Sequence, residues 1–418
     1  MIKLWNCDCL NMLRSLPDES VDSIVTDPPY GISFMGKKWD YDVPSEEIWA
    51  ECLRVLKPGG HLLSFSSART YHRLAVRIED AGFEIRDQAM WLYGSGFPKS
   101  QDIGKAIDKA AGAQREVTGS RVKSGDIKGG ALHSGAEKAG AGHKTEVVYT
   151  APATDAAKEW DGWGSALKPA HEPIVMARKP FKGTLALNVL NNRTGALNIN
   201  ACRVPFAGDA DEQETKGKNA HATLGTTSAR TVNTMNANTA ERKDYDAPGR
   251  WPANVIHDGS ECVVSLFPTS STTGKRKQSD RVQQDAGATP FTRGKGAPEY
   301  TDAGSAARFF YCAKPSPAER HRGCVNPGPQ FKHGATLRQV ENTATEGNNH
   351  PTVKPIALMR HLVTLVTPPG GIVVDPFMGS GTTGIAATQG GFIFYGAEMD
   401  DGHFNIAHAR IRYEVEHG

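Results

Sequence analysis

The stretch that decides the fold is GIVVDPFMGSGTTG, residues 371–384. A short apolar run, GIVV, leads into a turn rich in glycine, and IAATQG then continues with helical character. Gly379, Gly381 and Gly384 let the backbone approach a ligand closely at the start of a helix, and Glu398, which closes the next apolar run, stands where such units bind ribose hydroxyls. The pattern predicts a nucleotide-type cofactor site. Taken alone, it fits a nicotinamide dinucleotide site or a tight turn equally well.

Both ends of the chain alternate short apolar strands with segments of helical periodicity. SIVT and LLSF are two of the strands near the amino terminus, and the pattern resumes after about residue 350. This alternation predicts an α/β fold, a doubly wound and mostly parallel sheet with helices on both faces. Because ligands bind at the carboxyl ends of strands in such sheets, we expect the residues after SIVT and GIVV to belong to a site.

A second motif, Asp27-Pro28-Pro29-Tyr30, directly follows the strand VDSIVT. A carboxylate and a rigid proline carbonyl can each accept a hydrogen bond from an amine, which reshapes a delocalised base nitrogen for attack by positioning and electrostatics. An aromatic ring beside them can stack on a base that has been pulled out of a duplex. The alternative is a purely structural role, as a turn that ends the strand. The combination of acid, two prolines and ring favours a catalytic site.

The two motifs together resemble the amino-specific DNA methyltransferase family. Their order, catalytic motif first, long insert second and cofactor glycines last, is similar to the circularly permuted beta group of that family. The resemblance implies a Rossmann-like, class I S-adenosylmethionine-dependent methyltransferase fold with an inserted target-recognition domain. It also implies methylation of N6 of adenine, because the cytosine-N4 enzymes of the family usually carry Ser in place of Asp27. In a doubly wound sheet the strands before Asp27 and Gly379 would be neighbours.

The resemblance also assigns cofactor contacts. His350, Thr352 and Lys354 in HPTVKP match the segment that holds the methionine carboxylate, and Asp8 in NCDCL matches an acid that binds the adenine amino group of the cofactor. Phe377 matches a ring against the cofactor. The full set of expected contacts to S-adenosylmethionine is Asp8, Cys9, Asp27, His350, Thr352, Lys354, Asp375, Phe377, Gly379, Ser380, Gly381, Thr382, Thr383, Glu398, Met399 and Asp400.

Composition shifts along the chain predict its domain organisation. We expect residues 1–112 to form the catalytic half of the core, 113–150 a mobile loop, 151–181 a core strand region, 182–349 the target-recognition insert and 350–418 the cofactor-binding half. The whole chain has 48 Lys and Arg against 46 Asp and Glu, whereas residues 182–349 have 21 against 16. The positive excess therefore lies in the insert, where contacts to the phosphates of double-stranded DNA are expected.

Three lysines on two loops near the expected site, Lys37, Lys38 and Lys99, could also contact phosphates, although exposed lysines are often only solvated. A homodimer is possible, as in some members of the beta group. The seven cysteines lack a paired framework and the start lacks a secretory signal, so we expect reduced thiols and a cytoplasmic protein, encoded by a bacterium or a phage. No apolar run reaches the length of a membrane helix, and no closely paired ligands predict a metal site.

Several alternatives stay open. Methylation of cytosine N4 uses the same chemistry at an exocyclic amine, whereas methylation of cytosine C5 requires a thiolate that no motif here provides. A nicotinamide-dependent dehydrogenase would explain the glycine loop but gives no role to Asp27 and Tyr30. An inactive DNA-binding module that retains the fold is the third possibility. A restriction enzyme that accompanies a methyltransferase cannot be inferred from these residues.

Overall fold

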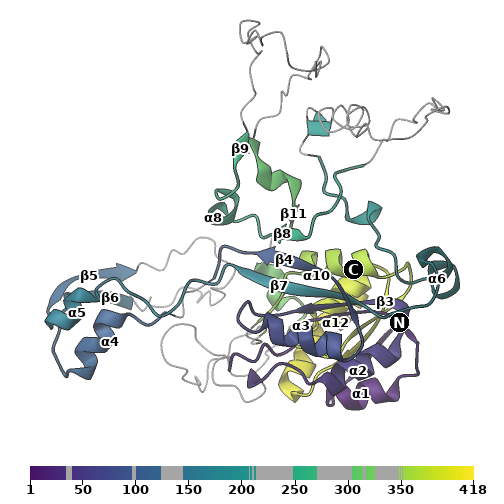
Figure 1. Cartoon of the computed structure of the whole chain (residues 1–418), viewed down its shortest axis with the longest axis horizontal. Coiled ribbons are helices and arrows are strands. Elements are labelled where there is room, and N and C mark those ends of the chain that lie inside the picture. Colours follow the sequence, from purple (N-terminus) through teal and green to yellow (C-terminus); the bar gives the residue numbers. More distant parts are fainter. Residues whose placement is uncertain are drawn as a thin grey trace, which may run out of the picture.

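A computed structural model of the chain has a nine-stranded, twisted sheet at its centre (Figure 1). It describes residues 1–33, 40–96, 100–123, 145–206, 208–209, 211–212, 248–270, 304–313, 317–324, 348, 350 and 352–418. The strands cross the sheet in the order β1 (Ile2–Trp5), β13 (Ile393–Ala397), β12 (Ile372–Asp375), β2 (Val21–Thr26), β3 (Leu56–Phe65), β7 (His171–Arg178), β4 (Glu84–Leu92), β8 (Val255–His257) and β11 (Tyr311–Cys312).

All neighbouring strands are parallel except β7, which runs antiparallel to both β3 and β4. The predicted doubly wound, mostly parallel sheet is therefore confirmed. β12 and β2 pair directly, with Val373 opposite Ser23, although about 350 residues separate them in the chain. Two strands from opposite ends of the sequence thus lie side by side, and their carboxyl ends are adjacent.

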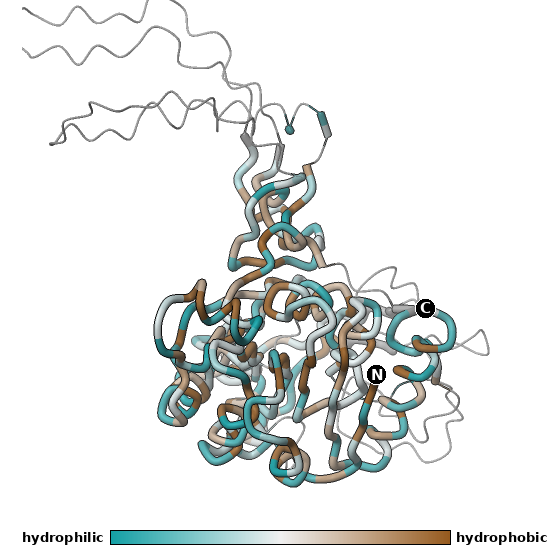
Figure 2. Tube along the Cα trace, turned by 90° about the vertical axis from the view of Figure 1, so that its right-hand side faces the viewer, coloured by the Kyte–Doolittle hydropathy of each residue, from teal (hydrophilic) through white to brown (hydrophobic). Residues whose placement is uncertain are grey.

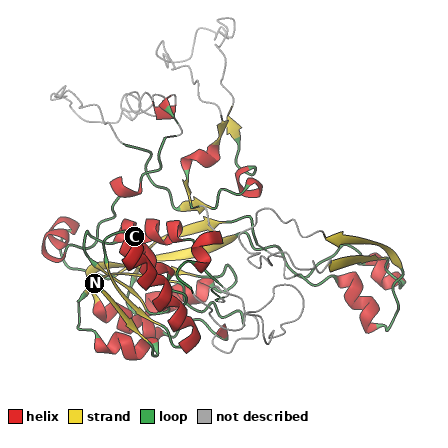
Figure 3. Ribbon diagram, turned by 180° about the vertical axis from the view of Figure 1, so that it is seen from behind, coloured by secondary structure: helices red, strands yellow, loops and turns green. Residues whose placement is uncertain are grey.

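Helices cover both faces of the sheet (Figure 3). Neighbouring residues of a strand point to opposite faces, so the buried strands present apolar side chains to the helices on each side. Val25 and Leu63 pack with the helices of the carboxyl-terminal half, whereas Ile24 and Leu62 pack with those of the amino-terminal half. Apolar residues accordingly concentrate inside the body of the molecule (Figure 2). The first layer contains α10 (Ile356–Val366), α11 (Thr382–Gln389) and α12 (Asp401–His417), and the second contains α1 (Cys9–Ser15), α2 (Glu46–Val55) and α3 (Tyr71–Asp80).

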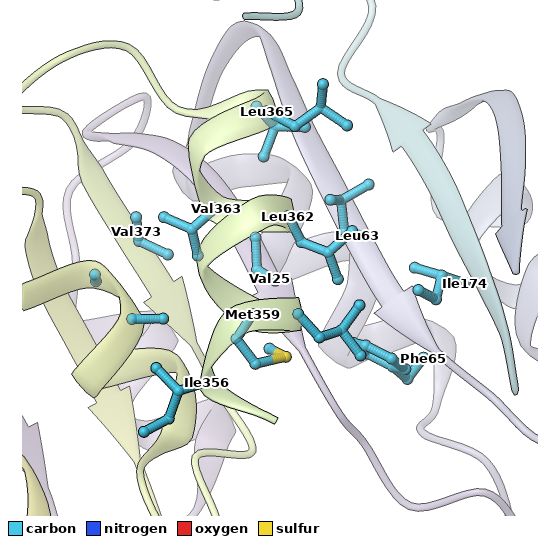
Figure 4. Close-up of a cluster of buried hydrophobic side chains, with 14 of the residues drawn as sticks. Val25, Leu63, Phe65, Ile174, Ile356, Met359, Leu362, Val363, Leu365 and Val373 are labelled. Atoms are coloured by element: carbon cyan, nitrogen blue, oxygen red, sulfur yellow. The ribbon is translucent and has the colours of Figure 1, made fainter. Parts of the chain in front are cut away.

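Helix α10 fills the centre of the first layer (Figure 4). Met359, Leu362 and Val363 are almost completely buried, and they lie against strand residues that include Val25 and Leu63. Full burial of a side chain of this size contributes roughly 1.5–3 kcal/mol. The helix therefore holds together the strands that carry both sequence motifs.

Between β4 and β7 the chain forms an extension that stands away from the sheet (Figure 1). The expected loop at 113–150 contains strands at both of its ends, since β5 (Val117–Lys123) and β6 (Thr145–Thr150) form an antiparallel pair. VTGSRVK and TEVVYT contain β-branched residues that favour a pleated strand, a signal that the high polarity of the surrounding residues obscured. Two short helices accompany this pair, α4 (Ile103–Ala110) and α5 (Asp155–Glu159).

Residues 182–349 contribute to the sheet as well. β8 and β11 come from this part of the chain and extend the sheet beyond β4. The division into a separate recognition insert stays a prediction. The other elements here are α6 (Leu185–Asn192), η3 (Asn200–Cys202), α8 (Glu261–Val264), β9 (Thr269–Ser270), β10 (Gly304–Ser305), η4 (Ala306–Phe309) and α9 (Pro317–His321). None of the helices described is long and apolar enough to cross a membrane.

Two buried hydrogen bonds link the halves of the chain behind the site. The hydroxyl of Thr26 donates to Asp375 Oδ1 at 2.6 Å, and the hydroxyls of Ser23 and Thr367 lie 2.7 Å apart. Burial raises the pKa of Asp375 to about 6, so above that pH the carboxylate is ionised and depends on its donors.

We expect Thr26→Val to lower the free energy of unfolding by about 1–3 kcal/mol at neutral pH, because the buried Asp375 carboxylate loses a donor while the volume is preserved. Urea denaturation measures the difference. Thr118→Val on β5, where the side chain is exposed, is the control and should leave stability nearly unchanged. Equal effects of the two substitutions would contradict the role of this hydrogen bond.

Candidate active site

The two sequence motifs meet at the carboxyl ends of β2 and β12. Asp27 is the first residue after β2, and Asp375 is the last residue of β12. The predicted neighbourhood of these strands is confirmed by their pairing and by the hydrogen bond from Thr26 to Asp375. The Asp27–Tyr30 motif and the glycine loop therefore begin at the carboxyl ends of two adjacent strands.

The Asp27 carboxylate is held by two donors. Lys354 Nζ lies 2.6 Å from Oδ2, and the hydroxyl of Tyr30 donates to Oδ1 at 2.6 Å. The side chain of Lys354 is only 7% exposed, so its ammonium faces the interior of the protein. Burial alone would lower the pKa of Lys354, but Asp27 and Glu172 raise it, and the side chain is therefore positively charged.

Glu172, on β7, is a member of this cluster that sequence reasoning missed. Its Oε2 lies 3.1 Å from the Tyr30 hydroxyl oxygen, within reach of the proton that the hydroxyl shares with Asp27, and 3.2 Å from Lys354 Nζ. Burial raises the pKa of Glu172, and the nearby Lys354 opposes that effect. The only sequence signal was an acid directly before the apolar run PIVMA, in the region 151–181 that we expected to contain a core strand.

The backbone of the Asp27–Tyr30 motif is fixed by side chains from elsewhere. Asp40 is buried and its Oδ1 accepts hydrogen bonds from the backbone N–H groups of Tyr30, at 2.6 Å, and Gly31, at 2.9 Å. The hydroxyl of Thr70 donates to the Tyr30 carbonyl at 2.6 Å. Burial and the adjacent Asp27 raise the pKa of Tyr30, so its hydroxyl stays protonated. Sequence reasoning missed Asp40 and Thr70, which act through the backbone.

The glycine loop after β12 is bound by Glu398. The backbone N–H of Gly379 donates to Glu398 Oε2, and the N–H of Asp400 donates to Oε1, each at 2.9 Å. Gly379 has φ +54°, and a Cβ there would lie 2.9 Å from His350 Nε2. Gly381 has φ +81° and caps α11. Both positions require glycine, because a side chain would strain the backbone and collide with His350 or with residues of α12.

The hydroxyls of this loop point into the protein. Arg410 on α12 donates to Ser380 Oγ at 3.0 Å and to Thr382 Oγ1 at 3.3 Å, and Thr383 donates to Asp375 Oδ2 at 2.5 Å. Ser380, Thr382 and Thr383 were predicted to contact a cofactor, but their side-chain oxygens are used internally. These residues can therefore offer a ligand their backbone atoms. Arg410, which binds the loop from α12, was not predicted.

Comparison with known proteins then decides the family. A model of the N6/N4 DNA methylase family matches residues 21–409, nearly the whole chain. This chain belongs to the DNA methylase family. The match spans both motifs and the region between them, so the alternative of a nicotinamide-dependent dehydrogenase is excluded.

Individual relatives differ in how much of this methylase they cover. Type II methyltransferase M2.DpnII of Streptococcus pneumoniae is 36% identical over 95 residues, which is 22% of this chain and 34% of that protein. Type II methyltransferase M.HindIII of Haemophilus influenzae is 21% identical over 98% of this chain and 95% of its own length. The chain thus spans about a third of the first relative and almost all of the second.

Two solved structures align over most of the methylase chain. M1.HpyAVI, determined as a complex with S-adenosylmethionine, has a TM-score of 0.38 at 15% identity and covers 98% of this chain and 99% of its own. The cytosine-N4-specific PvuII DNA methyltransferase has a TM-score of 0.41 at 14% identity and covers 98% and 86%.

S-adenosylmethionine is the methyl donor of this family and the cofactor of this methylase. The structure fits that molecule in two respects. Gly379 and Gly381 have positive φ and no side chains, so the backbone of the loop can lie close to a ligand, and the Glu398 carboxylate follows the next strand, where it can accept hydrogen bonds from ribose hydroxyls. Glu398 is largely buried, and burial raises its pKa to about 7.

The structure places the remaining predicted cofactor residues of the methylase in varied surroundings. Asp8 is exposed and caps α1, Cys9 is buried beside it, and the ring of Phe377 lies 6.4 Å from the ring of Trp49. Burial raises the pKa of the Cys9 thiol to about 12, as expected of a packing residue. Their roles toward a cofactor stay predictions.

The other predicted cofactor residues lie in the segment before α10 and in the loop after Glu398. His350 packs edge-on against His403, and burial lowers its pKa well below the ordinary value. Thr352 and Met399 are exposed, and Asp400 caps α12. Lys37, Lys38 and Lys99 lie outside the described residues. Within the described part of the methylase, no group of three His, Cys, Asp or Glu side chains is arranged to hold a metal ion.

We expect Glu398→Gln to weaken the affinity for S-adenosylmethionine roughly 10-fold at about pH 8, because a charged acceptor is replaced by a neutral one. The wild-type carboxylate takes up a proton as the pH falls through about 7, so wild-type affinity should decline between about pH 8 and 6, while the Gln variant lacks this component.

Calorimetric titration of both proteins across this range measures the effect. The amino group of the cofactor, with an ordinary pKa of about 8, titrates equally in both experiments, so only the difference between the two curves reports on Glu398. Parallel curves would contradict the assigned contact.

Proposed function

We propose that this methylase transfers a methyl group from S-adenosylmethionine to N6 of adenine in duplex DNA, with the target base extruded from the helix. The observation that carries the proposal is the Asp27 carboxylate at the end of β2, oriented by Lys354 and Tyr30 beside the glycine loop of β12. A fixed hydrogen-bond acceptor at this position is what an exocyclic amine requires.

The residues act on the amine nitrogen. When bound, S-adenosylmethionine supplies an electrophilic methyl group on a positively charged sulfur. Asp27 accepts one N–H of the adenine amine and the carbonyl of Pro28 accepts the other, which draws the nitrogen lone pair out of conjugation with the ring. In the described part of the chain, no backbone N–H donates to the Pro28 carbonyl, which supports this role. Pro29 stiffens the turn because its φ is fixed.

Lys354 takes a different role from the one that the resemblance implied. A methionine carboxylate would have to compete with Asp27 and Glu172 for the ammonium, and all three groups are largely buried. We therefore propose that Lys354 orients Asp27. Other groups, among them backbone N–H groups of the glycine loop, would bind the methionine end of the cofactor.

Duplex DNA is the substrate that the chemistry and the charge distribution support. The positive excess of residues 182–349 lies in a region that β8 and β11 attach to the sheet beside β4. We propose that this region recognises the DNA sequence and that the ring of Tyr30 stacks on the extruded base, an interaction worth roughly 1–3 kcal/mol. A homodimer, as in some members of the beta group, is a further proposal.

Cytosine N4 is the second candidate target, since its amine presents the same chemical problem. The acid at position 27 favours adenine, because cytosine-N4 enzymes of the family usually carry Ser there. The two targets give different products, N6-methyladenine and N4-methylcytosine, which nucleoside analysis separates directly.

We expect Asp27→Ala to lower methyl transfer to duplex DNA by at least about 1000-fold while the affinity for S-adenosylmethionine changes only a few-fold, since the acceptor of the amine is lost. Transfer of labelled methyl groups, followed by digestion to nucleosides, measures both rate and product. Asp155→Ala, at an exposed surface position, is the control and should retain wild-type activity. Full activity of the Asp27 variant, or N4-methylcytosine as the product, would overturn the corresponding part of the proposal.

A further inference from the structure

Two carboxylates of the site continue rows of buried apolar side chains. Val25 on β2 and Ile174 on β7 both belong to the cluster under α10 (Figure 4). Asp27 follows Val25 by two residues, and Glu172 precedes Ile174 by two residues. Because residues two apart on a strand point to the same face, and because β7 runs antiparallel to β3, both acids arrive at the same edge on the same side of the sheet.

Glu172 and Asp27 share their hydrogen-bond donors. Glu172 Oε2 lies 3.1 Å from the Tyr30 hydroxyl and 3.2 Å from Lys354 Nζ, and both donors also reach Asp27, one at each carboxylate oxygen. Lys354 thus lies between two carboxylates, with its Nζ 5.0 Å from the centre of the Phe65 ring. The proposed mechanism uses Asp27 and leaves Glu172 without a role.

We propose that Glu172 is a positioning residue for methyl transfer, whose carboxylate fixes Lys354 and Tyr30 in the places from which they hold Asp27. The inference rests on the proposed function for its link to the reaction, while the contacts themselves do not depend on it. A long lysine side chain and a tyrosine hydroxyl each have other orientations available. The second carboxylate restricts both to the one that leaves Asp27 facing the target amine.

The charge of Glu172 matters as well as its shape. Asp27 and Glu172 bring two carboxyl groups to the one ammonium of Lys354, and Tyr30 and Tyr93 are the other titratable groups that face Glu172. Loss of Glu172 leaves a buried ammonium with one carboxylate in place of two, and buried charges move toward any remaining partner or water. Displacement of Lys354 would then change the orientation of Asp27, and misplacement of a reacting group by about 1 Å can reduce a rate roughly 100-fold.

The first test separates positioning from binding by kinetics. We expect Glu172→Ala to lower kcat roughly 100-fold and Glu172→Gln roughly 10-fold, because the amide oxygen still accepts one of the two donors. The affinity for S-adenosylmethionine should stay within about twofold of wild type. Combined with Tyr30→Phe, the loss in Glu172→Ala should be less than additive, since both changes break the same contact.

The second test needs no methyl transfer. Lys354 is protected from amine-modifying reagents by its burial and its two carboxylates, so brief treatment with acetic anhydride and mass spectrometry should show several-fold faster labelling of Lys354 in both Glu172 variants. Lys57, which pairs with Asp22 elsewhere, should be labelled at an unchanged rate and reports on global unfolding. Glu84→Gln, which removes a carboxylate paired with Arg178 at the other end of β7, is the matched control for both tests.

The outcomes of the two tests distinguish failure of the inference from failure of the proposed function. If Lys354 is labelled faster but kcat is unchanged in an otherwise active enzyme, Glu172 holds Lys354 without positioning the reaction, and the inference is wrong. Unchanged labelling of Lys354 in the folded Glu172→Ala variant overturns it as well. If the wild-type protein transfers no methyl group to DNA, the proposed function fails while the labelling result still reports the contact.

Discussion

The site depends on one buried ammonium group. Lys354 lies between Asp27 and Glu172 with little access to water, and a charge in such a place is stable only while its partners stay close. The three residues come from the segment before α10, the end of β2 and the start of β7. Segments near residues 27, 172 and 354 therefore meet at the carboxyl end of β2, although they lie far apart in the sequence.

The two ends of the methylase chain contribute different kinds of structure to the site. The amino-terminal segment supplies a rigid turn, in which Asp40 and Thr70 hold the backbone of Tyr30. The carboxyl-terminal segment supplies a loop of glycines whose backbone is bound by Glu398 and Arg410. Asp375 and Thr26 join the two where their strands pair. Acid side chains thus fix the backbone on both sides of Asp27, the group that we propose as the acceptor for the amine.

Sequence reasoning predicted the parts of the site that follow from strand order. The strand that leads into Asp27 and the strand that ends in Asp375 are expected to be neighbours in a doubly wound sheet, and the position of Glu398 follows from the next strand. It missed Glu172, because the antiparallel insertion of β7 between β3 and β4 leaves no periodic signal. It also missed Arg410, whose contacts run from a helix to carbonyl and hydroxyl groups of the loop. The inward orientation of Lys354, which is bound by Asp27 and Glu172, could not be predicted either, since only three-dimensional packing decides whether a lysine contacts a ligand or a neighbouring acid.

The measurement that tests this account most directly is a crystal structure of the methylase with S-adenosylmethionine and a duplex that contains its recognised sequence. We predict one extruded adenine whose amine nitrogen lies within hydrogen-bond distance of Asp27, with Lys354 still bound by Asp27 and Glu172 and the glycine loop against the cofactor. A complex in which Lys354 turns to the carboxylate of the cofactor, or in which Asp27 is remote from the extruded base, would contradict it.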